Sequence, residues 1–377
     1  MHAKIKVCHL TSAHPENDIR IFHKQCISLH KSDFDVYLVV PNTKEKTNHG
    51  VQIKSFQSQK KGRLKRFLNT VNLVYKKALE IDADIYHFHD PELLRIGLKL
   101  AKRGKIVIYD AHEDVPKQIM DKHWIPKILR SLISYLFSMY EAYVAKRISG
   151  IVSVTENICD RFKKQNENVE LVANYPLLEE AKKMNQLDFK KNEKQICYIG
   201  GLFPTRGISE MVESLENIDV ELVLAGTFSP ESFKSELENK NSWKKVNYLG
   251  HVKREEIMKI LKTSKLGLVT LHPTRSYVES LPIKMFEYMS AGLPVIASNF
   301  PEWKNIINET NCGICVNPLD PNEIANAIKT ISNNPSQANL MGENGKNAFY
   351  KKYNWLIEEK KLIAFYKKLI QLKSQNQ

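Results

Sequence analysis

Two carboxylates, Glu279 and Glu287, have the type and spacing that most clearly suggest chemistry in this chain. They stand eight residues apart in the string YVESLPIKMFEYMSAGLPVIAS, which covers residues 277–298. Carboxylates accept hydrogen bonds from sugar hydroxyl groups. With an anion site between them, the pair could hold two sugars joined by a diphosphate, which is the shape of a nucleotide-sugar. The alternative is that both glutamates are solvated surface groups.

The segment between the glutamates predicts such an anion site. Pro282 is suited to the first position of a helix, where no backbone N–H is needed. Gly292 and Pro294 are typical of the end of a helix, so a short helix is predicted over residues 282–290, followed by a buried strand. The unpaired N–H groups near residues 281–284 and the helix dipole would together attract a phosphate.

The chain alternates apolar runs typical of strands with helix-like stretches. In the first half, strands are predicted at 4–10, 35–40, 84–88, 105–109 and 150–154, and helices at 17–31, 63–80, 91–103, 124–147 and 156–165. In the second half, strands are predicted at 195–199, 220–225, 245–249, 266–270, 294–297 and 314–316, and helices at 207–216, 230–238, 253–263, 282–290, 321–333 and 336–371. This alternation predicts an α/β fold with two parallel sheets, whose ligands bind at the carboxyl ends of the strands.

The domain organisation is predicted from the place where the alternation breaks. Residues 174–194 are polar and rich in Lys and Glu, which indicates a linker. It would join an N-terminal domain (1–173) to a C-terminal domain (195–350), and residues 351–377 would form a last helix.

Polar residues at two strand ends of the N-terminal domain are further candidates for ligand contacts. His112 and Glu113 follow the strand at 105–109, whereas His14, Asp18 and Arg20 follow the first strand. The second group could contact a phosphate or an acceptor. Equally, Asn17 or Asp18 could cap the next helix, with a salt bridge from Arg20.

Composition limits the classes of function. Lys and Arg number 56 and Asp and Glu 42, which gives a formal charge of +14 that attracts polyanions without choosing among them. The sequence shows no zinc-finger spacing or aromatic RNA-binding signature, so nucleic acid is not the expected partner. The six thinly spread cysteines, together with the lack of a signal peptide or of any run of about 18 apolar residues, predict a cytoplasmic protein. The DxD strings at 33–35 and 82–84 precede strands as turn residues would, so no metal and no cofactor are expected.

The string at 279–298 resembles the donor-binding signature of the retaining glycosyltransferases of family 4 (glycosyl transferases group 1), which have the GT-B fold. That signature is a Glu, seven residues, a second Glu and a stretch close to Ala-Xaa-Gly-Xaa-Pro-Val-Ile-Ala. Further motifs follow in family order over nearly the whole chain: HFHD at 87–90, YDAHE at 109–113, IGG at 199–201, RG at 206–207, LAG at 224–226 and LGH at 249–251. The resemblance implies two Rossmann-like domains facing across a cleft, with the last helix crossing back to the first domain. It also implies a hexose transfer from a UDP- or GDP-sugar with retention of configuration.

The same resemblance implies roles for individual residues. Glu279 would contact the transferred sugar, Glu287 the ribose hydroxyls, and His112 the donor sugar from the N-terminal domain, so that His112 and Glu279 form the catalytic pair without a metal. The other donor contacts would be Gly200 and Gly201, which let the backbone approach, Arg206 at the diphosphate, His251 and Val252 at the base, and Ser280, Leu281, Pro282 and Lys284 around the phosphates or sugar.

One departure from the family concerns the charge at the diphosphate. Many members carry a basic residue soon after the position of Gly200, whereas this chain has Gly201 there. Arg206 is therefore expected to carry the positive charge, with help from Lys284.

The acceptor is suggested by two features of the first half. A basic cluster at 60–66 and an apolar, aromatic helix at 124–147 favour peripheral contact with the anionic inner face of a membrane, where a lipid-linked acceptor would lie. The resemblance to the family suggests that this acceptor is a glycan for capsule, lipopolysaccharide or exopolysaccharide. The alternative for the helix is packing against the N-terminal sheet. Two other functions stay open: a nucleotide-sugar epimerase of the GT-B fold, which needs no acceptor, and a non-catalytic nucleic-acid-binding protein.

Overall fold

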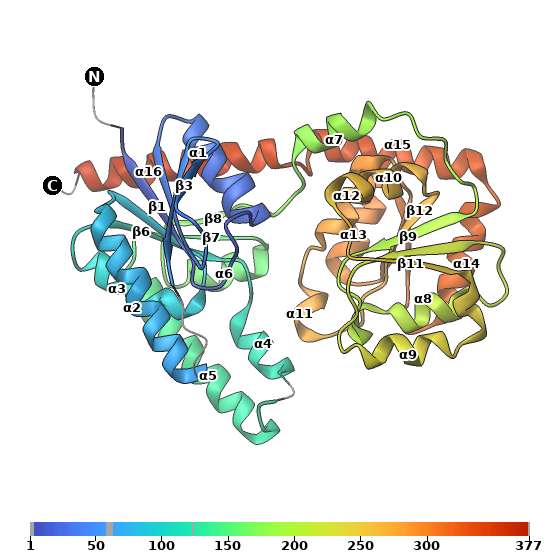
Figure 1. Ribbon diagram of the computed structural model, residues 1–377, viewed down its shortest axis with the longest axis horizontal. Coiled ribbons are helices and arrows are strands. Elements are labelled where there is room, and N and C mark those ends of the chain that lie inside the picture. Colours follow the sequence, from blue (N-terminus) through green and yellow to red (C-terminus); the bar gives the residue numbers. More distant parts are fainter. Residues whose placement is uncertain (1–3, 58–62, 123, 376–377) are drawn as a thin grey trace. The chain divides into compact units, whose positions relative to one another are not determined.

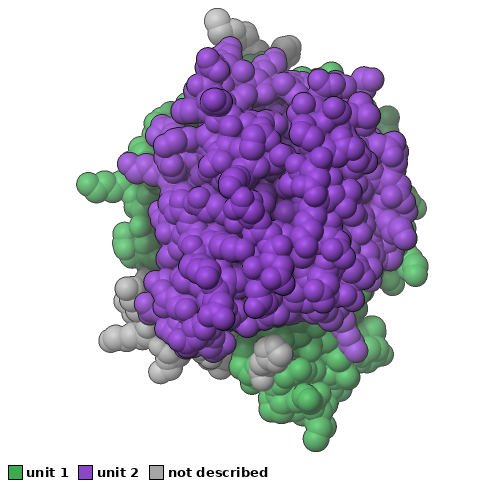
Figure 2. All heavy atoms as spheres, turned by 90° about the vertical axis from the view of Figure 1, so that its right-hand side faces the viewer, with its two compact units in different colours: residues 1–174, 356–377 green, residues 175–355 purple. Residues whose placement is uncertain are grey.

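The computed structural model describes residues 4–57, 63–122 and 124–375, with residues 63–68 described as backbone only. The chain divides into two compact units (Figures 1 and 2). Unit 1 consists of residues 1–174 and 356–377, and unit 2 of residues 175–355. Each unit has its own parallel sheet with helices packed on it, which confirms the α/β class and the two Rossmann-like domains predicted from the sequence.

The sheet of unit 1 has the strand order β3-β4-β2-β1-β5-β6-β7-β8. All neighbours are parallel except β3 and β4, which form an antiparallel hairpin at one edge. The order reverses between β1 and β5, and this reversal point is where ligands of such sheets bind. The strands are β1 Lys6–Leu10, β2 Asp35–Pro41, β3 Lys46–Asn48, β4 Val51–Phe56, β5 Ile85–Phe88, β6 Ile106–Ala111, β7 Gly150–Ser153 and β8 Val169–Leu171.

The helices of unit 1 follow the prediction with one correction. The helix expected over 124–147 is α5, which begins only after its N-cap Pro126 and ends at Ala145, while α4 lies before the expected span and was not predicted. The helices are the π-helical η1 Ile19–Cys26, α1 Ile27–Lys31, α2 Arg63–Ile81, the 3₁₀ turn η2 Pro91–Leu93, α3 Leu94–Ala101, α4 Val115–Asp121, α5 Lys127–Ala145, α6 Glu156–Lys163 and α16 Trp355–Gln375, which belongs to unit 1 from Leu356 onward.

The sheet of unit 2 has six parallel strands in the order β11-β10-β9-β12-β13-β14, which is the order of a doubly wound fold with its reversal between β9 and β12. Both faces carry a buried apolar cluster. All six strands lie where the sequence predicts them: β9 Gln195–Ile199, β10 Glu221–Ala225, β11 Val246–Gly250, β12 Leu266–Val269, β13 Val295–Ser298 and β14 Gly313–Val316.

The helices of unit 2 require two corrections. The segment 174–194 contains α7 and belongs to unit 2 from Tyr175, since Ala181 and Met184 of that helix are buried in the core. The helix expected over 336–371 is interrupted after Lys351. The helices are α7 Leu178–Asn185, η3 Pro204–Arg206, α8 Ile208–Ser214, α9 Ser232–Glu238, η4 Asn241–Lys245, α10 Arg254–Thr263, α11 Arg275–Val278, α12 Ile283–Ala291, α13 Pro301–Thr310, α14 Pro321–Ser332 and α15 Pro335–Lys351.

Within the part of the chain that the structure describes, no helix combines the length and the apolar composition needed to cross a membrane.

Candidate functional site

Helix α12 sets the geometry of the segment between the two signature glutamates. Pro282 is its N-cap rather than its first helical residue, and Gly292 is its C-cap in the left-handed conformation, so the predicted span was one residue early. One side of the helix is buried in the core of unit 2 through Met285, Phe286, Tyr288 and Met289. This anchoring leaves Lys284 and Glu287 half-buried on the other side.

Lys284 reaches the turn that follows β9. Its Nζ donates a hydrogen bond to Tyr198 Oη at 2.9 Å and lies 4.2 Å from the centroid of that ring. A Cβ atom on Gly200 would lie 3.2 Å from the same Nζ, so the amine rests against this turn. Burial and then the positive charge of Arg206 lower the pKa of Lys284 to about 7, although Glu287 opposes the shift. An anion placed here would relieve the repulsion between the two basic groups.

Arg206 is held at the carboxyl end of β12 by a close backbone contact. Its neighbour Gly207 has a φ of +72°, and a Cβ atom there would lie 1.9 Å from the carbonyl oxygen of Thr270, so only glycine fits. The guanidinium lies over the ring of Tyr277, 4.6 Å from its centroid. Its Nε is buried and has no hydrogen-bond partner among the described residues. A phosphate oxygen would supply the missing acceptor.

Glu287 forms an ion pair that the sequence did not lead us to expect. Its Oε1 lies 2.7 Å from Nη1 of Arg254, and Nη2 of the same guanidinium lies 2.7 Å from Oε2 of Glu180. Arg254 is the first residue of α10, where a positive charge is unfavourable to the helix dipole. That placement is the one sequence signal that could have suggested a carboxylate partner.

The remaining donor candidates lie on the same edge of unit 2. Glu279 is the half-buried C-cap of α11. His251 is exposed directly after β11, while Val252 packs against the core. The loops after β9, β11 and β12 and the start of α12 thus carry all the predicted donor residues: Gly200, Gly201, Arg206, His251, Val252, Glu279, Ser280, Leu281, Pro282, Lys284 and Glu287.

In unit 1, Asp110 at the end of β6 is the centre of a buried hydrogen-bonded network. Arg20 donates to both carboxylate oxygens at 2.9 Å, and Gln25 Nε2 donates to Oδ2 at 2.7 Å. His89 connects Asp110 to His9: its Nδ1 lies 3.2 Å from Asp110 Oδ2, and its Nε2 lies 2.9 Å from His9 Nδ1. Burial alone would raise the pKa of Asp110, but the Arg20 guanidinium and His89 hold it well below its usual range. Arg20 therefore forms the internal salt bridge that was one of its two predicted roles.

His112 lies beside this network and is half-buried. Its Nδ1 is 3.2 Å from the carbonyl oxygen of Asp110. Since a carbonyl oxygen can only accept, Nδ1 carries the proton and Nε2 is left as an acceptor. Burial lowers the pKa of His112 against the opposing charge of Asp110, so the ring is neutral at neutral pH.

The loop after β1 brings His14 next to His112, with ring centroids 5.6 Å apart. His14 Nδ1 lies 3.3 Å from Asp18 Oδ2, and this hydrogen bond raises the pKa of His14. Asp18 also caps η1 by accepting from the amide of Ile21 at 2.8 Å. Glu113, the last candidate of unit 1, is exposed next to His112.

Among the residues that the structure describes, two groups have ligand atoms close enough to share a metal ion: His9, His87 and His89, and His89, Asp110 and His112. A hydrogen bond already joins His9 to His89. The Arg20 guanidinium on Asp110 would also repel a cation. The geometry therefore favours a hydrogen-bonded network over a metal centre.

The chain matches two family models: Glycosyltransferase Family 4 over residues 20–174 and Glycosyl transferases group 1 over residues 179–348. The uncharacterized glycosyltransferase MJ1607 of Methanocaldococcus jannaschii is 25% identical over 245 residues, which are 61% of this chain and 61% of that relative's length. The MMP alpha-(1->4)-mannosyltransferase of Mycolicibacterium hassiacum is 21% identical over 301 residues, which are 75% of this chain and 70% of that protein. The match to the first of these relatives thus spans less than two thirds of its length.

Solved structures share the fold at low sequence identity. Sucrose-phosphate synthase from Thermosynechococcus elongatus has a TM-score of 0.77 at 15% identity, over 98% of this chain and 100% of the other. Anabaena Alr3699/HepE in complex with UDP-glucose has a TM-score of 0.71 at 14% identity, over 97% and 100%. WaaG, a glycosyltransferase involved in lipopolysaccharide biosynthesis, has a TM-score of 0.71 at 14% identity, over 96% and 99%. With the two family models covering both units, these likenesses show that the chain belongs to the glycosyltransferases of the GT-B fold.

Proposed function

We propose that the protein is a retaining, metal-independent glycosyltransferase that transfers a hexose from a nucleotide-diphosphate-sugar to an acceptor. The anion site of unit 2 carries this proposal. There, Arg206 has a buried Nε without a hydrogen-bond partner among the described residues, and it lies next to the Lys284 amine. Because HepE binds UDP-glucose, a UDP-sugar is the first donor to test and a GDP-sugar the second.

Each group of the site then has a chemical task. Arg206 and Lys284 would stabilise the negative charge that develops on the leaving diphosphate, as a metal ion does in other transferases. Glu287 would accept the ribose hydroxyls and Glu279 a hydroxyl of the transferred sugar. For His112 we propose the role that the resemblance implies, a contact with the sugar, in which its neutral ring offers Nε2 as an acceptor.

Thermal stabilisation by a panel of UDP-, GDP-, ADP-, CMP- and dTDP-sugars tests the donor site. A ligand at 100 times its Kd stabilises the folded state by about 2.7 kcal/mol. We expect one donor to raise the Tm of the wild type and of a control, Glu302→Ala, whose side chain is exposed on α13. Glu287→Ala should lose the shift. If no nucleotide stabilises the wild type, the transferase function loses its main support, whereas donor turnover without acceptor would favour an epimerase.

The acceptor side of the proposal, a lipid-linked glycan of a surface polysaccharide at an anionic membrane, rests on α5. Figure 1 shows α5 and α4 projecting beyond the sheet of unit 1. Most of α5 is uncovered: Ile128 is 91% exposed, Tyr135 62% and Leu136 57%. Basic residues flank this apolar surface at Lys127 and Arg130. The basic cluster at 60–66, in contrast, lies outside the residues whose side chains are described.

Liposome flotation tests the membrane contact. The wild type should float with anionic vesicles at low salt and stay behind with zwitterionic vesicles, because the apolar area and the positive charge act together. Ile128→Glu combined with Leu136→Glu should abolish flotation. Leu340→Glu, which alters a similarly exposed leucine of unit 2, should leave it unchanged. Equal behaviour of all three proteins would remove the membrane proposal.

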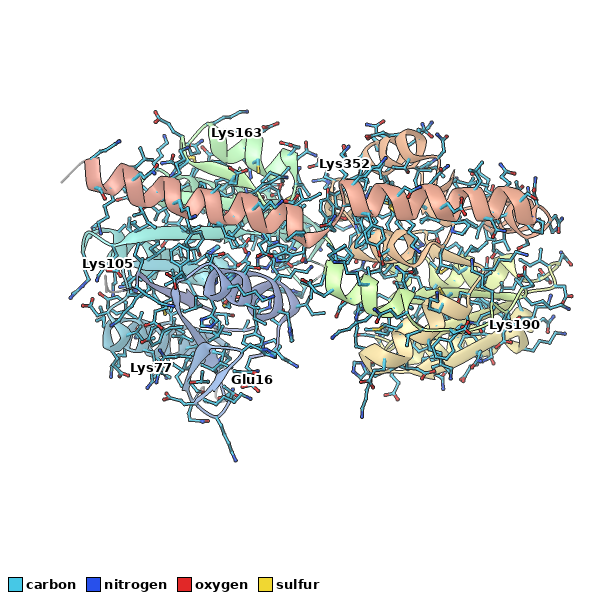
Figure 3. All side chains as sticks on the ribbon, turned by 90° about the horizontal axis from the view of Figure 1, so that it is seen from above. Glu16, Lys77, Lys105, Lys163, Lys190 and Lys352 are labelled. Carbon is cyan, nitrogen blue, oxygen red and sulfur yellow. The ribbon has the colours of Figure 1, made fainter. Side chains whose placement is uncertain are left out.

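The distribution of lysines argues against the nucleic-acid alternative. Lys77, Lys105, Lys163 and Lys352 are at the periphery on different elements (Figure 3). Each is paired with a carboxylate, and the distances are 3.1 Å to Glu80, 2.7 Å to Asp82, 2.9 Å to Asp160 and 2.9 Å to Glu309, respectively. These charges are dispersed and paired, whereas a phosphate backbone would require a continuous basic track.

A further inference from the structure

Arg254 joins three helices of unit 2 through one side chain. Its guanidinium contacts Glu287 on α12 and Glu180 on α7, each at 2.7 Å, although Arg254 itself begins α10. All three side chains are partly accessible, with exposures of 32%, 17% and 30% for Arg254, Glu287 and Glu180. The ion pairs thus lie at the surface of the donor site and not in the core.

The contact fixes the orientation of one signature glutamate. Arg254 is the only described group paired with the side chain of Glu287. An ionised carboxylate has about four acceptor positions, so this ion pair leaves capacity for two further hydroxyl groups. A carboxylate that is already held in place loses less conformational freedom when it binds a diol.

We propose that Arg254 is a positioning residue that presents Glu287 to the ribose hydroxyls, and that Glu180 holds Arg254 in place. The inference rests on the proposed donor-binding function of Glu287. Arg254 acts through Glu287 and touches no part of the donor. The α7 helix thereby takes part in nucleotide recognition although it carries no signature residue.

The test compares ribonucleotides with their deoxyribose analogues. Dissociation constants are measured for UDP and 2′-deoxy-UDP, and for the corresponding GDP pair, with the wild type, Arg254→Met, Glu180→Gln and the control Glu179→Gln. Glu179 is the exposed neighbour of Glu180 on α7, so its variant removes the same charge without touching Arg254. Melting temperatures establish that each variant is folded.

Arg254→Met should weaken binding of the ribonucleotide about tenfold. It should weaken binding of the 2′-deoxynucleotide less, because that ligand offers Glu287 only its 3′-hydroxyl, so the preference for ribose falls. Glu180→Gln should lose part of the preference and Glu179→Gln none. In a Glu287→Gln background, Arg254→Met should have no further effect. The inference would be overturned if the Arg254→Met variant kept the wild-type preference for ribose, or if it bound both nucleotides more weakly by the same factor. A wild type that binds no nucleotide would instead overturn the proposed function, and the inference with it.

Discussion

The affinity of unit 2 for a nucleotide-sugar should fall as the pH rises above 7, because of Lys284. Burial, followed by the charge of Arg206, lowers the pKa of this amine from its usual 10.5 to about 7. A diphosphate next to Nζ favours the protonated form, so binding above pH 7 requires the uptake of a proton. The diphosphate of a nucleotide-sugar is esterified at both ends, and its own charge does not change in this range.

The size of the effect follows from the pKa. If the bound amine stays protonated, the apparent Kd rises by a factor of roughly 1 + 10^(pH − 7), which is about tenfold per unit above pH 7. The free energy of unfolding of the unliganded protein, in contrast to its affinity for the donor, should increase with pH. Between pH 7 and 10.5 the unfolded chain binds more protons at Lys284 than the folded chain does, so stability rises with pH over this window.

Isothermal titration calorimetry measures both the affinity for the nucleotide-sugar and the number of protons taken up on binding. Titrations at pH 6 to 8.5, in buffers with different ionisation enthalpies, should show almost one proton taken up per nucleotide-sugar at the highest pH and almost none at the lowest. Lys284→Arg should bind with little pH dependence, since a guanidinium stays charged. Lys304→Arg, at an exposed position of α13, should behave as the wild type. Constant wild-type affinity without proton uptake would refute the reasoning.

Two predictions concern stability and are checked by urea unfolding. Gly292→Ala should cost about 1 kcal/mol, and Gly207→Ala more than about 2 kcal/mol. Both glycines have φ near +70°, but the new Cβ meets a backbone oxygen at 1.9 Å at Gly207 and at no less than 3.7 Å at Gly292, so equal losses would contradict the steric argument. Asp110→Asn should cost about 3–5 kcal/mol, because the buried Arg20 guanidinium loses its counter-charge. Glu309→Gln, at an exposed ion pair, should stay within about 0.5 kcal/mol, and a similar value for Asp110→Asn would show that Arg20 is stabilised otherwise.

The sequence predicts the fold best where strands are continuously apolar. The central strands β9, β10, β12 and β13 of unit 2 lie in such runs, which are typical of a parallel sheet covered on both faces. The hairpin of β3 and β4 escaped prediction because it lies at the sheet edge, where β3 carries only polar residues and β4 alternates between buried and half-buried positions. The helix α13 was missed although Pro301 marks its start and its buried residues Trp303, Ile306 and Ile307 have the i, i+3, i+4 spacing of a helix.

The candidate site was predictable to the extent that it is local in sequence. Glu279 and Glu287 could be read from one short string, and α12 begins between them as expected. The ion pair of Arg254 with Glu287 and the salt bridge of Arg20 with Asp110 join distant segments, and only the fold brings those side chains together. The sign of a side chain's charge does not show which of the many acidic residues will pair with a given arginine.

The departure from the family at Gly201 has a physical counterpart in the fold. The Lys284 amine rests against the Gly200 turn, where a Cβ would lie 3.2 Å from Nζ, so α12 supplies a basic group beside a turn that carries none of its own. A lysine amine and an arginine guanidinium differ in how their charge depends on pH. A guanidinium stays charged at any physiological pH, whereas the buried amine of Lys284 titrates near neutrality. The positive charge beside the Gly200 turn should therefore fall as the pH rises through 7.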